Sequence, residues 1–174
     1  MKNLNAKSII VLTIICLVVS VALAGVNYAT APIIEAADAA AAFEACFEVM
    51  PGASNFENVT LPEGLPGTVS AVYRETSGQG YAVKLTTKGY ETGLVILCGI
   101  SAEGKITGTT IVSSNETPSI GGQCGKPTYA DQYLGLGNDL SQVEGISGAT
   151  LTSTAYKNAV ADALSAFAKL EGRQ

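Results

Sequence analysis

Histidine and tryptophan are absent from this sequence of 174 residues, and only 14% of its residues are charged. Because there is no imidazole, Ser-His-Asp catalysis, Cys-His catalysis and zinc sites that contain histidine are excluded. Lysine and arginine number 10 against 15 acidic residues, which gives a net charge of −5 and a pI near 4.7. A nucleic-acid partner requires clustered cations that neutralise phosphates, so none is expected. The hydrophobic content of 47% is too high for a disordered chain.

Cysteine is scarce and widely spaced. The four cysteines, at positions 16, 46, 98 and 124, form no CxxC motif, so neither a metal ribbon nor a thioredoxin-like site is expected. No other metal site is predicted. Beyond the first cysteine we expect mostly buried thiols, or one disulfide bridge. Cys98 lies in an apolar run and is predicted to belong to the core, because a free cysteine behaves as a small hydrophobe.

A long uncharged segment lies near the N-terminus. No residue from 8 to 34 is charged, and its most apolar part, residues 9–26, would form a helix about 27 Å long, close to the hydrocarbon thickness of a bilayer. Lys2 and Lys7 precede this segment, and the positive-inside rule therefore places the N-terminus in the cytoplasm.

The predicted organisation is a cytoplasmic tip (1–7), a transmembrane anchor (8–30) and an extracytoplasmic domain (31–174). The chain would be a single-pass protein of the cell membrane. The alternative is a cleaved signal peptide, because Ala22-Leu23-Ala24 resembles an A-x-A cleavage site. The apolar run exceeds the usual length of a signal-peptide core, which favours a retained anchor.

The rest of the chain has the pattern of one α+β domain. Residues 33–49 predict a helix, and residues 51–68, rich in proline and glycine, predict a loop. Four strands are expected at 69–76, 81–87, 94–100 and 105–112, in a mostly antiparallel sheet with one covered face.

The C-terminal part combines an irregular stretch with a clear helix. Residues 113–137 lack a periodic pattern apart from a short helix at 129–136, and such a long irregular stretch is usually functional. Residues 150–171 have apolar residues at helical spacing, with Ser147 and Thr150 as candidate caps. The predicted fold is therefore a transmembrane helix followed by an antiparallel sheet flanked by helices.

Two segments resemble catalytic motifs but lack an essential part. Residues 145–149 match G-x-S-x-G, whose serine requires a histidine base that this chain does not have. Residues 121–126 resemble a P-loop, but the spacing between the glycines is one residue short and Pro127 replaces the Ser or Thr that binds magnesium.

The segment before the last helix is suited to an anion. Small residues from Ser147 to Ala149 allow a ligand to approach the backbone, and a helix N-terminus presents unpaired N–H groups that favour a phosphate. The alternative interpretation is a capped helix that follows a glycine-containing turn.

Three motifs, in order, resemble the FMN-binding domain family. The segment Glu144-Gly145-Ile146-Ser147-Gly148-Ala149-Thr150 resembles the flavinylation motif Asp-x-x-(Ser/Thr)-Gly-Ala-Thr. Residues 115–121 resemble the loop His-x-Glu-Thr-Pro-Gly-Leu-Gly, and residues 89–108 resemble the strand run Gly-Tyr…Gly-Lys-Ile-x-Gly. Together with the anchor, the whole chain is similar to the G subunits of Rnf electron-transport complexes and, more distantly, to the C subunits of sodium-pumping NADH:quinone reductases.

The resemblance implies that Thr150 carries FMN through a phosphoester bond. A separate flavin transferase would install the cofactor, with FAD as the donor. The residues expected around the phosphate are Ser147, Gly148, Ala149, Leu151 and Thr152. The loop residues expected near the ribityl chain or the ring are Glu116, Thr117, Pro118, Ser119, Ile120 and Gly121. Three positions depart from the family pattern, since Glu144 replaces Asp, Ser119 replaces Gly and Asn115 replaces His.

Other side chains are candidates for contact with the flavin ring. Lys126 is a candidate cation near the pyrimidine edge, where reduced flavin is stabilised by N–H donors or positive charge. The alternative is a solvated loop lysine. Tyr90, Tyr129 and Tyr133 are candidates for stacking on the ring, with ordinary core or surface packing as the alternative for each.

The resemblance further implies an electron-carrying part of a membrane complex that couples ferredoxin:NAD+ oxidoreduction to Na+ or H+ translocation. The chain would be one part of an oxidoreductase that acts as a translocase, not a complete enzyme. Its partners would be the other Rnf subunits, a flavin transferase and the membrane. An alternative of another class is a membrane-anchored structural or assembly protein without a cofactor, as in pilin-like proteins.

Overall fold

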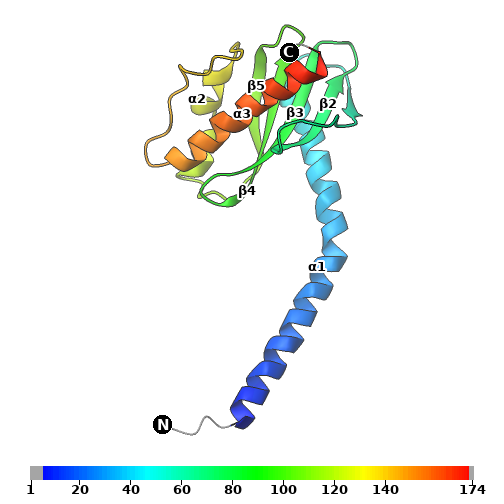
Figure 1. The fold of residues 1–174 in the computed structure, drawn as a ribbon, viewed down its shortest axis with the longest axis vertical. Coiled ribbons are helices and arrows are strands. Elements are labelled where there is room, and N and C mark those ends of the chain that lie inside the picture. Colours follow the sequence, from blue (N-terminus) through cyan, green and yellow to red (C-terminus); the bar gives the residue numbers. More distant parts are fainter. Residues whose placement is uncertain (1–5, 173–174) are drawn as a thin grey trace. The chain divides into compact units, whose positions relative to one another are not determined.

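The computed structural model describes residues 6–172, which begin with one long helix, α1 (Ala6–Val49). The chain divides into two compact units, residues 1–39 and residues 40–174, so α1 begins in the first and ends in the second. We call the second unit the head. The predicted helix at 33–49 continues the N-terminal helix without a break, and Pro32 lies inside it (Figure 1). The predicted cytoplasmic tip lies mostly outside the described residues.

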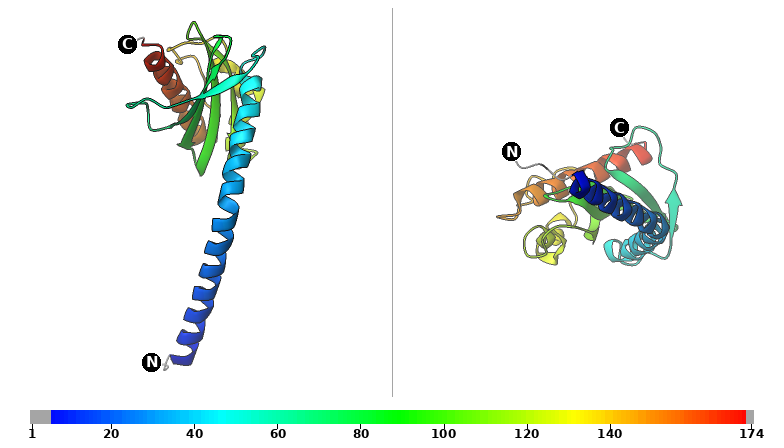
Figure 2. Two further views of the ribbon diagram at one scale, coloured as in Figure 1. Left: turned by 90° about the vertical axis from the view of Figure 1, so that its right-hand side faces the viewer. Right: turned by 90° about the horizontal axis from the view of Figure 1, so that it is seen from below.

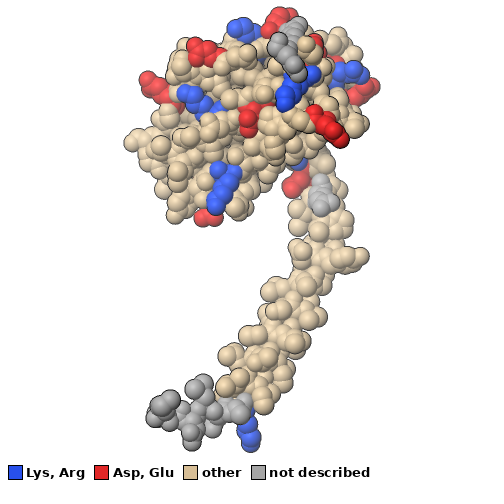
Figure 3. Space-filling view, viewed as in Figure 1, with Lys and Arg blue, Asp and Glu red and all other residues tan. Residues whose placement is uncertain are grey.

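The part of α1 in the first unit has the composition of a membrane span. It is long and apolar enough to cross a bilayer, with a mean hydropathy of 3.0 over an 18-residue window. None of the residues in that window is buried within the chain. Figure 3 shows this helix almost without charged side chains, whereas the visible face of the head carries both signs interspersed.

Five antiparallel strands form the sheet of the head, in the order β1-β2-β3-β4-β5. The strands are β1 (Phe56–Val59), β2 (Val69–Glu75), β3 (Gly80–Lys88), β4 (Thr92–Ser101) and β5 (Ile106–Ser113). The predicted α+β class and the four predicted strands are confirmed. The sequence prediction missed β1, because a strand of four residues between prolines and glycines carries little periodic signal.

The sheet is covered on both faces, which corrects the expectation of one covered face. Neighbouring residues of a strand point to opposite faces. In β4, Ile96 and Cys98 belong to a cluster with the C-terminal helix α3 (Thr150–Leu170), while Leu97 between them packs with Cys46 and Val49 at the end of α1. Figure 2 shows α3 and the last turns of α1 on opposite sides of the sheet. The uninterrupted apolar run of β4 reflects this double burial.

The end of α1 lies against the backbone of the sheet. A Cβ atom added to Gly99 would lie 2.5 Å from the carbonyl oxygen of Val49, and one added to Gly108 would lie 2.8 Å from it. Thr107 Oγ1 donates a hydrogen bond of 2.6 Å to the same oxygen. The final carbonyls of a helix have no partner within the helix, so this hydroxyl satisfies one of them.

All four cysteines are free thiols, and Cys46, Cys98 and Cys124 are buried. Burial raises the pKa of Cys98 to about 12 and that of Cys124 to about 11. Such thiols are poor nucleophiles at neutral pH. The prediction that Cys98 lies in the core is confirmed.

The helix α3 closes the fold and confirms the helix predicted at 150–171. The predicted caps are wrong, because the N-cap residue is Ala149 and no side chain caps the helix. Three short helical turns lie between β5 and α3: η1 (Gly121–Gly125), α2 (Pro127–Ala130) and η2 (Asp131–Tyr133). The predicted short helix at 129–136 therefore begins earlier and is broken into two turns.

Glu75, which is 1% exposed, organises the turn between β2 and β3. The Ser77 hydroxyl donates to its carboxylate, and so do the N–H groups of Gln79, Ser54 and Ser77. These bonds, with the Ser77 hydroxyl as the largest cause, outweigh desolvation and lower the pKa of Glu75 to about 2.

We predict that Glu75→Gln lowers the unfolding temperature of the full chain in detergent at pH 7. The pKa of Glu75 is lower in the folded state than its ordinary value of 4.5, so the ionised carboxylate stabilises the fold fully above pH 4.5. This stabilisation is lost as the pH falls through about 2. The difference from the unsubstituted chain therefore shrinks between pH 4.5 and 2. As a control, Glu57→Gln removes only an exposed pair with Arg74 and changes little. A Glu75→Gln difference that does not depend on pH would contradict the prediction.

Candidate functional site

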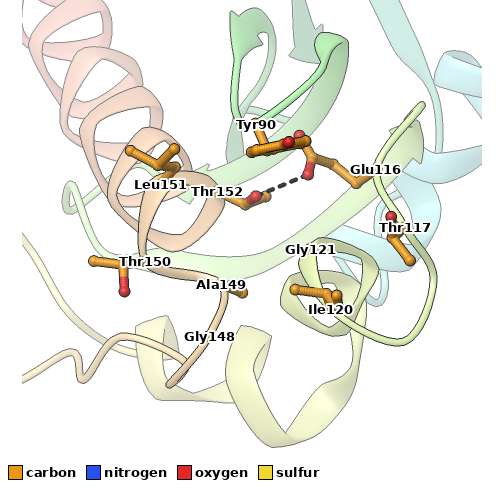
Figure 4. A pocket seen from close by; sticks show the side chains of 10 residues that line it. All are labelled: Tyr90, Glu116, Thr117, Ile120, Gly121, Gly148, Ala149, Thr150, Leu151 and Thr152. Atoms are coloured by element: carbon orange, nitrogen blue, oxygen red, sulfur yellow. Dashed lines mark hydrogen bonds between the residues drawn. The ribbon is translucent and has the colours of Figure 1, made fainter.

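Three segments of the head enclose a cavity of about 470 Å³, within the size range of small-molecule sites. The segments are the turn between β3 and β4, the loop that follows β5, and the beginning of α3 (Figure 4). The residues that line the cavity are Tyr90, Glu116, Thr117, Ile120, Gly121, Gly148, Ala149, Thr150, Leu151 and Thr152. All of them are among the site residues predicted from the sequence. We call this cavity the α3 pocket.

The N-terminus of α3 opens into the pocket. Ser153 N–H donates to Ala149 O at 2.9 Å and starts the helical bonding, so the amides of residues 150–152 have no partner within the helix. No side chain caps them. Gly148, with a φ of +81°, turns the chain into the helix in a conformation that favours glycine. Thr150 is the first residue of α3 and is exposed. An anion beside Thr150 would therefore meet unpaired N–H groups and the positive end of the helix dipole.

A buried carboxylate joins the three segments. Glu116 is 7% exposed, and Thr152 Oγ1 donates a hydrogen bond of 2.8 Å to its Oε2 (Figure 4). Glu91 N–H in the turn between β3 and β4 donates at 3.0 Å to its Oε1. The loop is also held at its start, where Asn115 Nδ2 donates to Thr92 O at 2.9 Å. One side chain thus holds the loop, the turn and the first turn of α3 together.

Two glycines make room for this carboxylate. A Cβ atom added to Gly89 would overlap Glu116 Oε1, and one added to Gly121 would overlap Oε2 and lie 2.8 Å from Thr152 Oγ1. Gly121 was predicted as a site residue, but Gly89 and the amide of Glu91 were not. The motif at residues 89–108 begins with Gly89 and Tyr90, and this pair could have indicated that Gly89 belongs to the site.

Large apolar side chains line the pocket and are exposed. Tyr90 is 68% exposed, Leu151 64% and Ile120 49%. Exposed apolar surface beside a concave site is typical of a place where an apolar ligand binds. Among the described residues that line the pocket, Glu116 is the only charged one. The pocket therefore suits a ligand that has an apolar part and an anionic group held by helix amides.

Four predicted residues do not line the pocket. Lys126 Nζ donates to Gln123 Oε1 at 3.3 Å, and the carbonyl of Ser119 accepts from Gln123 Nε2 at 2.9 Å. Pro118 lies in the same loop, and Ser147 is exposed just before the pocket residues.

Two of the three candidate tyrosines belong to the core. Tyr129 and Tyr133 are buried and pack with Tyr156, with ring centroids 5.5 to 5.7 Å apart. Tyr133 donates to Tyr129 Oη, because Tyr129 itself donates to Ser153 O at 3.0 Å. Burial raises the pKa of Tyr133 above its ordinary value. Of the three, only Tyr90 lines the pocket.

The segment that leads to Thr150 is held by side chains from neighbouring elements. Gln132 pairs with the backbone of Glu144: its Oε1 accepts from Glu144 N–H at 2.8 Å, and its Nε2 donates to Glu144 O at 3.4 Å. Lys157 Nζ donates to Val143 O at 3.2 Å. The side chain of Glu144 remains exposed, so the backbone of this segment is ordered while its carboxylate faces solvent.

Comparison with known proteins agrees with this geometry. The FMN-binding domain family matches residues 89–165, from the turn beside Glu91 into α3. The chain is 33% identical over 178 aligned residues to the G subunit of the Na(+)-translocating ferredoxin:NAD(+) oxidoreductase complex of Acetobacterium woodii, covering 87% of this chain and 86% of that relative. It is 32% identical to the G subunit of the ion-translocating oxidoreductase complex of Methanosarcina acetivorans, covering 74% and 76%. The chain belongs to the family of Rnf complex G subunits.

A solved structure shows the same fold at lower similarity. The C subunit of the Na(+)-translocating NADH-quinone reductase from Parabacteroides distasonis superposes with a TM-score of 0.50 at 22% identity, over 60% of this chain and 62% of that one. The family resemblance seen in the sequence is confirmed by the curated relatives and the matched domain. As an Rnf G subunit, the chain is part of an ion-translocating oxidoreductase and has an FMN-binding domain.

We predict that Gly121→Ala disrupts the pocket of this Rnf protein, whereas Gly122→Ala does not. A methyl group at Gly121 collides with Glu116 and Thr152, whereas one at Gly122 lies 3.5 Å or more from its neighbours. Overpacking of this kind costs about 1–3 kcal/mol. Urea unfolding of the full chain in detergent is the measurement. Equal free energies of unfolding for the two variants would show that the carboxylate is not confined as described.

Proposed function

We propose that this Rnf protein transfers electrons through FMN that is attached to Thr150 by a phosphoester bond. The complex would couple ferredoxin:NAD+ oxidoreduction to the translocation of Na+ or H+. The observation that carries the proposal is the exposed hydroxyl of Thr150, which lies at the pocket and at the uncapped N-terminus of α3. The curated relatives include complexes named for sodium and for protons, so either ion is compatible with the family.

The attachment requires help from another protein. A threonine hydroxyl is a weak nucleophile unless a base activates it. The carboxylate in the pocket already accepts hydrogen bonds from Thr152 and Glu91, and no histidine exists in the chain. A flavin transferase would therefore supply the activation. In that reaction Thr150 Oγ1 would form the new bond to the FMN phosphorus of FAD, the pyrophosphate bond would break, and AMP would leave while the hydroxyl proton passed to the transferase.

The residues present fit the cofactor. The amides of residues 150–152 would hold the phosphate, while Tyr90, Ile120 and Leu151 offer apolar surface to the ring. Bound FMN supplies one- and two-electron transfer, and a covalent bond prevents its loss from a protein exposed to bulk solvent. Tyr90 would stack on the ring.

The predicted residues outside the pocket wall have supporting roles. Pro118 and Ser119 would shape the loop, and Ser147 would border the phosphate. Lys126, which donates to Gln123 Oε1, would remain outside the wall.

The membrane arrangement follows from charge and apolar length. The N-terminal helix would cross the membrane once, with Lys2 and Lys7 on the cytoplasmic side and the head outside. The helix would pack against the other subunits of the complex. A structural protein without a cofactor, as in pilin-like assemblies, would have no use for an exposed threonine beside unpaired helix amides and an apolar cavity.

We predict that the full chain, co-produced with a flavin transferase, gains the mass of one FMN less one water, whereas Thr150→Ala does not. Thr154→Ala is the matched control, since Thr154 is exposed on the same helix and lies one turn later. Intact mass spectrometry and in-gel flavin fluorescence after denaturation are the measurements. An unmodified wild-type chain, or an adduct that persists in Thr150→Ala, would refute the proposed attachment.

A further inference from the structure

We propose that the carboxylate of Glu116 lowers the reduction potential of the flavin held in the α3 pocket, and that Thr152 tempers this effect through its hydrogen bond. This inference rests on the proposed function, because it concerns FMN attached at Thr150. It assigns to Glu116 a role beyond contact with the cofactor, and it assigns to Thr152 an opposing one.

The side-chain charge in the wall of the α3 pocket is negative. Glu116 lines the pocket and is the only charged residue to do so among the described residues. No lysine or arginine of the described chain lines this pocket. A ligand in the pocket therefore faces one negative side chain without a compensating positive one in the wall.

The hydrogen bonds to Glu116 do not neutralise its charge. Both oxygens of Glu116 accept: Oε1 from Glu91 N–H at 3.0 Å and Oε2 from Thr152 Oγ1 at 2.8 Å. Both donors are neutral, so they orient the carboxylate and disperse part of its charge without cancelling it. Because the side chain is nearly buried, water screens the charge less than it would at the surface.

The carboxylate of Glu116 is confined by the backbone of two glycines. Gly89 and Gly121 lie so close to the carboxylate that a Cβ atom at either position would displace it. The backbone at these two glycines therefore lies against the carboxylate and limits how far it can turn when a charged group binds.

A negative charge beside a flavin lowers its reduction potential. Reduction adds electrons and negative charge to the ring, and a fixed carboxylate nearby disfavours that change. The potential is therefore lower than it would be with a neutral residue. Thr152 donates a hydrogen bond to the carboxylate and weakens its field, so loss of the hydroxyl strengthens the effect.

The test uses two variants that perturb the same hydrogen bond but change the charge differently. Glu116→Gln removes the charge and keeps the shape, whereas Thr152→Val keeps the charge and removes the donor. The full chains are co-produced with a flavin transferase and studied in detergent. Spectroelectrochemical titration gives the flavin potential, and thermal unfolding of the same chains made without the transferase gives the stability.

We expect the potential to shift upward in Glu116→Gln and downward in Thr152→Val. The unfolding temperature falls in both, because Thr152→Val removes one donor and Glu116→Gln has only one oxygen for the two donors. A merely structural role for Glu116 would shift both potentials in the same direction or leave both unchanged, and either result overturns the inference.

Three further results distinguish failure of the inference from failure of the proposed function. If Glu116→Gln does not accumulate, Thr152→Val decides alone: a lower potential supports the inference, while an equal or higher one overturns it. A wild-type chain that carries no flavin after co-production refutes the proposed function and the inference with it. A flavin on all three chains with equal potentials refutes the inference alone.

Discussion

The hydrogen bond from Thr152 to Glu116 connects the first turn of α3 to a loop 36 residues earlier in the chain. Through the second oxygen of the carboxylate, the same residue holds the turn between β3 and β4. The α3 pocket exists because these three segments meet around one side chain. Since a buried carboxylate is costly unless its oxygens are satisfied, the arrangement is specific: each partner must be in place for the others to be stable. The exposed hydroxyl of Thr150 takes its position from this arrangement.

The sheet separates the site from the attachment of the N-terminal helix. The cluster that includes Tyr156 and Phe167 fixes α3 on one face, and the cluster that includes Cys46 and Leu97 fixes the end of α1 on the other. A core on each side gives the five strands more buried apolar area than one covered face would provide. The α3 pocket can therefore be shaped by loops at one end of the strands, while the end of α1 packs on a different surface of the head.

Local sequence patterns predicted the strands β2 to β5 and the helix α3 to within a few residues, because alternation and helical spacing are properties of neighbouring residues. The short strand β1 was missed, since four residues carry too little periodicity. The double burial of the sheet was also missed, although the apolar run in β4 was visible. The sequence prediction named Ser147 and Thr150 as caps, whereas the N-cap residue is Ala149. Side chains that are suitable for capping do not by themselves show where a helix begins.

The sequence by itself determined the class of the protein: the motif that ends in Thr150, the loop that contains Glu116, and the uncharged N-terminal segment identify the family. It also named the residues that line the pocket. Only the tertiary structure decided which tyrosine faces the pocket, that Lys126 points to Gln123, and that Gly89 and the amide of Glu91 belong to the site. The reason is physical, since the hydrogen bonds and close contacts of Glu116 join segments distant in the chain. Such contacts leave no local pattern, because they arise only when the sheet and α3 have packed together.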